Sequence, residues 1–340
     1  MRAYININRR TLLDNYEKIV QEVYPKKLFV VLKANAYGHG ISEMAKLFAT
    51  ARNPGFVVAT LEEAMMVRKS LVFNPLLLLE STSDYKTCVN LKLNVAVHTL
   101  GKLKEMADKR LPLSVHLNVN TGLNRDGLEP SEVEEAVQIL RTSNLKLKGV
   151  YTHHSDPLNI KRENELFESV LPAFKPFGNI LIHAGSSSAI DYEDGFSNAI
   201  RIGGSIYGLY HNQKVKTEPA LELLAPIWHV KKVAKDDTVG YGTSFKVPAD
   251  GYVYLLPIGY KDGFPRSRKT IGFLAGEILV QVGQTMMDHM IMFSKKEFGE
   301  GQTVELIGHN LNVFELAKLY KTIPYELCST LGERLKRNYI

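Results

Sequence analysis

The sequence predicts an α/β protein with an N-terminal (β/α)8 barrel, the TIM barrel fold, followed by a mainly antiparallel β domain. Two observations predict this architecture. Eight short apolar runs recur roughly every 24 residues through the first two thirds of the chain, a spacing that suits a strand, a loop and a crossover helix. After about residue 220, alternating apolar and polar residues with glycine turns indicate antiparallel strands. We therefore expect a barrel domain at residues 1–220 and a β domain at residues 221–340.

The apolar runs are the expected barrel strands. They comprise residues 28–32, 56–59, 75–79, 94–97, 113–119, 147–151, 179–182 and 199–202. Between them lie amphipathic segments that suit helices, such as residues 41–51, 61–70 and 131–140. Near-continuous apolar strands that alternate with helices form parallel sheets covered on both faces, and eight units close a barrel. An open doubly wound sheet is the competing fold, but it would carry a glycine-rich nucleotide-binding turn after its first strand.

The expected strands of the β domain are shorter and half-buried. They comprise residues 227–234, 252–258, 277–282, 290–293 and 303–307. The boundary falls in the segment 217–219, which contains a proline.

Composition excludes several functional classes. The chain has 340 residues, of which 45 % are hydrophobic and 23 % charged, so it is neither disordered nor a mini-protein. The net charge of +6 comes from 42 basic and 36 acidic residues without a basic arm, which disfavours nucleic-acid binding. Cys88 and Cys328 have neither disulfide-scaffold nor zinc-site spacing. Because no apolar segment is long enough to span a membrane, we expect a cytoplasmic protein.

Polar residues follow several of the expected barrel strands, where the reactive groups of such barrels lie. Lys33 directly follows the first strand, and burial there would lower the pKa of its amine and make it a nucleophile toward carbonyl groups. A lysine that merely extends to solvent from a strand end is the alternative interpretation. The other candidates are Tyr37, His39, Arg125, His153, His154, Ser186, Ser187, Ser188, Arg201, Gly203 and Gly204.

The serine-rich turn at residues 186–188 and the glycine pair at residues 203–204 follow the last two barrel strands. Hydroxyl groups and unobstructed backbone N–H groups at these positions can hold a phosphate group. A reactive lysine combined with a phosphate site indicates pyridoxal 5'-phosphate as the cofactor.

The segment KANAYGHG at residues 33–40 resembles the cofactor-lysine signature of the alanine racemase family, which are pyridoxal-phosphate-dependent amino-acid racemases. Further motifs similar to this family follow in order over nearly the whole chain. They are NTGLNRDG at 120–127, TH at 152–153, HAGSS at 183–187, RIG at 201–203, YG at 207–208, VGYG at 239–242, PIGYKDG at 257–263 and MD at 287–288. The resemblance implies an isomerase that interconverts L-alanine and D-alanine for cell-wall synthesis, and a homodimer whose sites are shared between subunits.

The resemblance also implies roles for individual residues. Lys33 would bind the cofactor as a Schiff base and act as one proton-transfer base, and Tyr241 of the partner subunit, oriented by His153, would be the other. Arg201 would bind the pyridine nitrogen and keep it unprotonated, because its guanidinium is a permanent cation. Arg125 would orient the cofactor ring oxygen and the substrate carboxylate. Tyr37, Ser187, Gly203 and Gly204 would hold the phosphate, and Tyr260, Met287 and Asp288 would contact the substrate.

Two positions depart from the family pattern. Asn118 stands where many members carry a carbamylated lysine, whose negative charge braces the arginine corresponding to Arg125. Because a guanidinium needs an anionic partner when buried, we expect a chloride ion between Asn118 and Arg125, with Asp126 or a water as the alternative. Glu333 lies near the position where the family often places a phosphate-binding tyrosine, so a carboxylate there would repel the phosphate.

Other functions fit part of the pattern. A racemase for serine, lysine or several amino acids has the same two bases, because the pocket walls choose the side chain. A decarboxylase of the same architecture generally sets a carboxylate at the pyridine nitrogen, where this chain has Arg201. A non-catalytic pyridoxal-phosphate-binding protein would have the barrel without the β domain.

Overall fold

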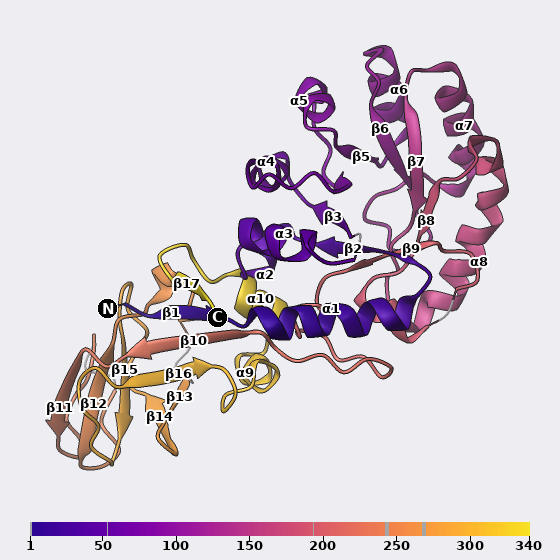
Figure 1. The fold of residues 1–340 in the computed structure, drawn as a ribbon. Helices are drawn as coiled ribbons and strands as arrows, with labels where there is room; N and C mark the ends of the chain where they lie inside the picture. The colour runs from indigo at the N-terminus through magenta and orange to yellow at the C-terminus, as the bar shows by residue number, and fades with distance from the viewer. Residues whose placement is uncertain (1, 53, 193, 242–244, 267–269) are drawn as a thin grey trace. The chain divides into compact units, whose positions relative to one another are not determined.

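The computed structural model describes residues 2–52, 54–192, 194–241, 245–266 and 270–340. The chain divides into two compact units, one formed by Leu13–Thr217 and the other by the residues up to Leu12 together with Glu218–Ile340. Both are drawn in Figure 1.

The first unit is an eight-stranded parallel barrel in the part of the chain that is described. Its strands are paired in the order β8-β7-β6-β5-β4-β3-β2-β9. They are β2 (Lys27–Val31), β3 (Gly55–Val58), β4 (Leu76–Leu78), β5 (Asn94–Val97), β6 (Ser114–Asn118), β7 (Lys146–Tyr151), β8 (Leu181–His183) and β9 (Ala199–Ile202). Each overlaps one of the eight apolar runs, so the barrel prediction is confirmed.

Asn198 joins the two ends of this sheet. Its backbone N–H donates to the carbonyl of Ile182 at 3.0 Å, and its side-chain oxygen accepts from the Ile182 N–H at 2.8 Å. Its side-chain amide also donates to the carbonyl of Ile180 at 3.0 Å. An asparagine side chain thus replaces part of the backbone ladder between β8 and β9.

Helices cover the outside of the barrel strands, as Figure 1 shows for α4 to α8. The helices of this region are α1 (Arg9–Val23), α2 (Lys33–Tyr37), α3 (Ile41–Ala49), α4 (Leu61–Lys69), α5 (Tyr85–Asn90), α6 (Leu100–Asp108), α7 (Val133–Thr142) and α8 (Ile160–Val170). Short 3₁₀ segments are η1 (Pro130–Glu132), η2 (Pro157–Asn159), η3 (Leu171–Phe177) and η4 (Ser187–Asp191). The N-terminus of α4 has a complete capping box between Thr60 and Glu63.

The barrel interior is filled by side chains, as expected for eight strands. Its buried cluster comprises Phe29, Val31, Val57, Leu77, Ala96, Tyr151 and Ala199, with Tyr37, Leu79 and Leu181 packed against it. The space inside the barrel is therefore a core, and chemistry is confined to its rim.

The second unit contains a nine-stranded, largely antiparallel sheet in its described part, with the order β11-β12-β15-β14-β13-β16-β10-β1-β17. The strands are β1 (Tyr4–Ile7), β10 (Leu221–Pro226), β11 (His229–Val233), β12 (Gly251–Leu256), β13 (Ile271–Leu274), β14 (Glu277–Gln281), β15 (Met290–Ser294), β16 (Thr303–Ile307) and β17 (Lys336–Tyr339). The unit also contains η5 (Tyr260–Asp262), α9 (Val313–Tyr320) and α10 (Pro324–Ser329). The five strands expected from the sequence are present.

The N-terminal strand differs from the sequence prediction, which assigned all of residues 1–220 to the barrel. β1 runs antiparallel to β10 and parallel to β17, with Ile5 opposite Leu223 and Ile7 opposite Leu221. Ile5 and Ile7 are fully buried. Pairing these alternate apolar residues with β10 buries them, and this long-range partner cannot be deduced from the local pattern.

Among the residues described, no helix is long and apolar enough to cross a membrane. Both cysteines are buried free thiols.

Candidate active site

The predicted site residues of the first unit lie at or just beyond the carboxyl ends of β2, β6, β7, β8 and β9. Lys33 and Tyr37 follow β2, Arg125 follows β6, His153 follows β7, Ser187 follows β8, Arg201 lies on β9 and Gly203 and Gly204 follow it. Because the strands are parallel, these positions share one rim of the barrel.

Lys33 is followed by an unusual backbone turn. Ala34, Asn35, Ala36 and Tyr37 all have φ between 53° and 54°, which is the left-handed region. Left-handed residues other than glycine are normally isolated, because each costs roughly 1–2 kcal/mol. Strained backbone of this kind persists only when the surrounding structure holds it, and it concentrates at functional sites.

Glu63 accepts a hydrogen bond from this left-handed turn and was not among the residues predicted from the sequence. One carboxylate oxygen of Glu63 accepts from the Ala34 N–H at 2.6 Å. The other accepts from the N–H groups of Ala59 and Thr60 at 2.8 and 3.3 Å. A single carboxylate thus ties the residue after Lys33 to the N-terminus of α4.

Electrostatic interactions tie Lys33 to other groups on the rim. Burial lowers the pKa of the Lys33 amine, the positive charge of Arg125 lowers it further, and Glu63 and Glu80 oppose the shift. Burial, followed by Arg201 and Arg125, lowers the pKa of His153 to about 3, so this imidazole is neutral at physiological pH. The rim therefore combines an amine of increased nucleophilicity with a neutral imidazole.

Arg201 is 5 % exposed and is held by neutral acceptors. Its guanidinium donates to the carbonyls of His183 and Thr152, both at 2.7 Å, and to the His183 Nδ1 atom. It also lies 4.9 Å from the centre of the Tyr151 ring. Burial lowers the pKa of Arg201 to about 10, which still leaves it charged at neutral pH.

Two further histidines continue inward from Arg201. Since the guanidinium can only donate, His183 Nδ1 must accept, and His183 Nε2 carries the proton. That Nε2–H then donates to His116 Nδ1 at 2.8 Å, which leaves the His116 proton on Nε2. The Nε2 atom of His116 is buried and has no hydrogen-bond partner among the described residues. Burial lowers the pKa of His116 to about 3.

Tyr37 and Gly203 lie in direct contact. A Cβ atom added at Gly203 would lie 2.3 Å from the Tyr37 hydroxyl oxygen, so only glycine allows this approach. Burial raises the pKa of Tyr37 to about 12, which keeps its hydroxyl protonated. Ser187 is 7 % exposed, and its hydroxyl accepts from the Ser205 N–H at 3.2 Å, in the segment that continues from Gly204. The four predicted phosphate-site residues thus come from adjoining segments of the rim.

The environment of Arg125 includes an anion from the chain itself. Its Nε donates to Asp126 Oδ2 at 3.4 Å, and the Asn118 amide donates to Asp126 Oδ1 at 2.9 Å. The Asp126 carboxylate therefore contacts both Asn118 and Arg125, the two groups between which a chloride ion was expected from the sequence. The expectation rested on a buried guanidinium, but the Arg125 side chain is 61 % exposed.

The remaining predicted residues belong to the second unit. Tyr241 is 81 % exposed, and Tyr260 and Met287 are 43 % and 53 % exposed. Asp288 accepts from Arg334 at 2.8 Å, and Glu333 is exposed. Gly242, part of one of the family motifs, lies outside the described residues.

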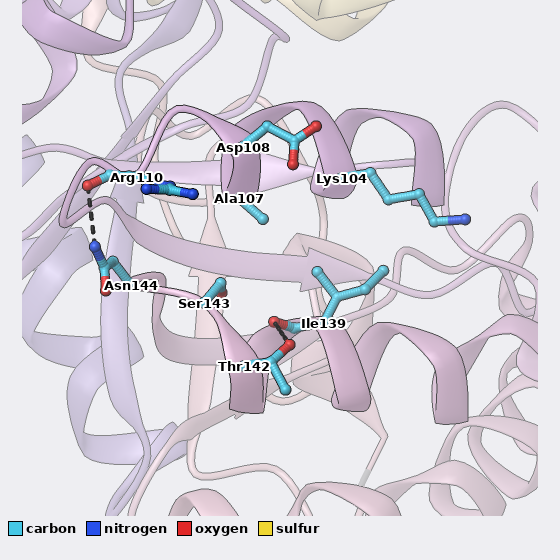
Figure 2. A pocket seen from close by; sticks show the side chains of 8 residues that line it. All are labelled: Lys104, Ala107, Asp108, Arg110, Ile139, Thr142, Ser143 and Asn144. Atoms are coloured by element: carbon cyan, nitrogen blue, oxygen red, sulfur yellow. Dashed lines mark hydrogen bonds between the residues drawn. The ribbon is translucent and has the colours of Figure 1, made fainter.

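A pocket with a volume of about 540 Å³ lies at the other end of the barrel, and Figure 2 shows the side chains that line it. It is lined by Lys104, Ala107, Asp108, Arg110, Ile139, Thr142, Ser143 and Asn144. These residues belong to α6, α7 and the segments that lead into β6 and β7, at the amino ends of the strands. None of the predicted site residues lines it.

Comparisons with known proteins cover the whole chain. The family model described as alanine racemase, N-terminal domain, matches residues 7–211, and that of the alanine racemase C-terminal domain matches residues 220–339. An alanine racemase of Streptococcus suis is 33 % identical over 98 % of this chain and 96 % of that protein. One of Listeria monocytogenes is 32 % identical over 99 % of this chain and 98 % of that protein.

Solved structures share the fold. An alanine racemase of Clostridium difficile has a TM-score of 0.95 and 25 % identity, covering 100 % of this chain and 96 % of that one. The alanine racemase from Bacillus anthracis, solved with bound L-Ala-P, has a TM-score of 0.92 and 26 % identity over 100 % of this chain and 95 % of that one.

Proposed function

Because this chain belongs to the alanine racemase family, we propose that it is a pyridoxal-phosphate-dependent isomerase that interconverts L-alanine and D-alanine and supplies D-alanine for cell-wall synthesis. The observation that carries the proposal is Lys33, an amine of lowered pKa at the end of β2, held by the strained turn of residues 34–37.

The barrel residues fit the cofactor. Tyr37 and Gly203 meet without an intervening side chain, and Ser187 and Gly204 lie in the adjoining segments, so hydroxyl and backbone N–H groups of the kind that hold a phosphate lie close together. Arg201 carries a buried guanidinium suited to the pyridine nitrogen. Lys33 supplies the amine for covalent attachment.

Pyridoxal phosphate, when bound to an amino acid, withdraws electrons from Cα and so acidifies its hydrogen. Racemisation then requires a base on each face of Cα. We assign Lys33 to one face, because its lowered pKa increases the neutral fraction that can accept a proton. We assign the other face to the partner subunit's Tyr241, oriented by His153; the high exposure of Tyr241 supports this role.

Arg201 tunes the reaction. With a pKa of about 10 Arg201 remains a cation, so it would donate a hydrogen bond to the ring nitrogen of the cofactor without giving up a proton. Arg201 would thereby keep that nitrogen unprotonated and its electron withdrawal weak, which would favour return of the proton to Cα.

Arg125 binds the substrate carboxylate and the cofactor ring oxygen in this proposal. Tyr260, Met287 and Asp288 of the β domain contact the substrate from the partner subunit. This division of roles requires a homodimer, and we propose that the homodimer acts in the cytoplasm, in keeping with two free thiols among the described residues. The sequence also predicts a chloride ion beside Arg125, and the Asp126 carboxylate is the alternative anion at that place.

Two other functions remain alternatives for the experiment to separate. A racemase of serine, lysine or several amino acids would use the same bases with different pocket walls. A non-catalytic pyridoxal-phosphate-binding protein would hold the cofactor without exchanging the α-hydrogen.

The test is incubation of pure, cofactor-loaded protein with L-alanine, L-serine and L-lysine in separate reactions, followed by chiral chromatography. The proposal predicts D-alanine as the fastest product and no D-alanine from Lys33→Ala protein. Preferential formation of D-serine or D-lysine would establish the first alternative. Bound cofactor with no D-isomer of any of the three would support the second.

A further inference from the structure

We propose that Asp126 is the built-in counter-anion of Arg125, and that Asn118 positions its carboxylate so that Arg125 is held for the substrate without any bound ion. The substrate role of Arg125 rests on the proposed function; the placement of Asp126 does not. Asp126 is a positioning residue in this proposal, because it acts through Arg125.

The backbone fixes Asp126 beside the end of β6. The loop that leaves β6 returns to it, since the Leu128 N–H donates to the Asn118 carbonyl and the Asn120 N–H donates to the Leu128 carbonyl, both at 2.8 Å. Gly127 has φ of +113°, and a Cβ atom there would lie 2.7 Å from the Asn120 backbone nitrogen. The closure therefore depends on the glycine next to Asp126, and it places the carboxylate against the strand end.

Asn118 is oriented toward an anion. It is 2 % exposed, and its amide nitrogen donates to Asp126 Oδ1 at 2.9 Å and to His98 Nδ1 at 3.2 Å. If the amide were turned around, its oxygen would face the Asp126 carboxylate, which is repulsive. Both N–H groups of this buried amide are therefore used, one of them on the carboxylate.

His98 fixes the same arrangement from the neighbouring strand. Its Nε2 lies 2.6 Å from the Leu79 carbonyl oxygen, which can only accept, so Nε2 carries the proton. Because the Asn118 amide nitrogen donates, Nδ1 of His98 accepts from it, and the Asp126 carboxylate remains as the acceptor for Arg125. His98 Nδ1 is 3.6 Å from Asp126 Oδ2.

The charge arrangement explains why a carboxylate is useful here. Arg125 lowers the pKa of both Lys33 and His153. A carboxylate against its Nε offsets part of this positive field while leaving the terminal N–H groups of the guanidinium to a ligand. Because the anion is covalently part of the loop, its occupancy does not depend on the halide or bicarbonate concentration.

The experiment compares Asp126→Asn with Asp126→Glu and with Asp108→Asn, which makes the same substitution on α6 at the opposite end of the barrel. Thermal unfolding of the cofactor-loaded dimer is measured in chloride, bromide, formate and gluconate at constant ionic strength. Alanine KM and kcat are measured in the same buffers. Bromide-soaked crystals are searched for an anomalous peak beside Arg125.

The proposal predicts that the wild-type protein has the same unfolding temperature, KM and kcat in gluconate as in chloride. It also predicts no bromide peak beside Arg125 in wild-type crystals. Asp126→Asn raises the KM for alanine about ten-fold with a smaller change in kcat, and chloride or formate restores part of the loss. Its crystals gain a bromide peak beside Arg125. Asp126→Glu retains most of the wild-type KM, and Asp108→Asn is unchanged.

Wild-type protein that depends on halide and shows a bromide peak beside Arg125 would overturn the proposal in favour of chloride. Asp126→Asn that matches Asp108→Asn in every buffer would overturn it as well. If the wild type has no racemase activity, the proposed function fails, but the unfolding and bromide measurements still decide the role of Asp126.

Discussion

Replacing Glu63 by glutamine tests whether this side chain holds the strained turn behind Lys33. The carboxylate accepts from Ala34 through one oxygen and from Ala59 and Thr60 through the other. Glutamine has one oxygen, and it keeps more hydrogen bonds by turning that oxygen to Ala59 and Thr60. Its NH₂ group then faces the Ala34 N–H, so two donors oppose each other.

The magnitude follows from the bond that is lost. A hydrogen bond to a charged group contributes roughly 1.5–3 kcal/mol, so we expect local opening of the turn to become easier by about 2 kcal/mol. Since 1.4 kcal/mol is a factor of ten, amide exchange should accelerate about 30-fold. Removing the negative charge of Glu63 also lowers the pKa of Lys33 further, because that charge opposes the shift caused by burial.

The assay is hydrogen–deuterium exchange by mass spectrometry on the peptide that contains residues 33–41. The control is Glu62→Gln, an exposed neighbour on the same helix with the same change of charge. If the exchange rates of the two variants agree within a factor of three, Glu63 does not hold the turn and the reasoning is refuted.

Three other predictions use the same contacts. Gly203→Ala should destabilise the barrel by about 1–3 kcal/mol and weaken cofactor binding, because the new Cβ meets the Tyr37 hydroxyl. The control is Gly195→Ala, whose Cβ would have nothing within 4 Å. It should match the wild type in urea unfolding and cofactor titration. The pKa of His116 is about 3 in the folded protein against an ordinary value of 6.5, so the unfolded chain binds the extra proton and the free energy of unfolding falls as the pH drops from 6.5 toward 3. His116→Asn keeps an acceptor for His183 and should reduce the slope of this free energy against pH by about 1.4 kcal/mol per pH unit. An unchanged slope between pH 6 and 4 would contradict this. Mixing inactive Lys33→Ala and Tyr241→Phe homodimers should restore activity through one intact site per mixed dimer, whereas no recovery after verified subunit exchange would indicate a site built within one chain.

The sequence predicted the barrel strands because each is a buried apolar run, and burial depends on local composition. β2 and β9, for example, are five and four residues of which most are buried, and both stand out from their flanking segments. β1 was not predicted, because its alternating isoleucines are buried only through pairing with β10, more than 200 residues away. Long-range pairing of this kind has no local signal.

The site was predictable to the extent that residue type reveals chemistry. A lysine after an apolar strand and glycines after the last strand indicated attachment and phosphate binding, although the contact between Gly203 and Tyr37 required the structure. The left-handed turn was hidden, because residues 34–36 contain no glycine and Glu63 lies 29 residues away. His116 was also hidden, since a histidine inside an apolar run looks like any buried strand position.

The most direct test of the central claim, two-base racemisation of alanine, is the isotope content of D-alanine formed from protiated L-alanine in heavy water. Chiral chromatography of samples taken in the first few per cent of conversion, followed by mass spectrometry, would give the α-deuterium content of each enantiomer. If Lys33 and the partner subunit's Tyr241 act on opposite faces of Cα, the new D-alanine carries α-deuterium from its first appearance while the remaining L-alanine stays protiated. D-alanine that retains the original α-hydrogen, or the absence of any D-alanine, would contradict the account.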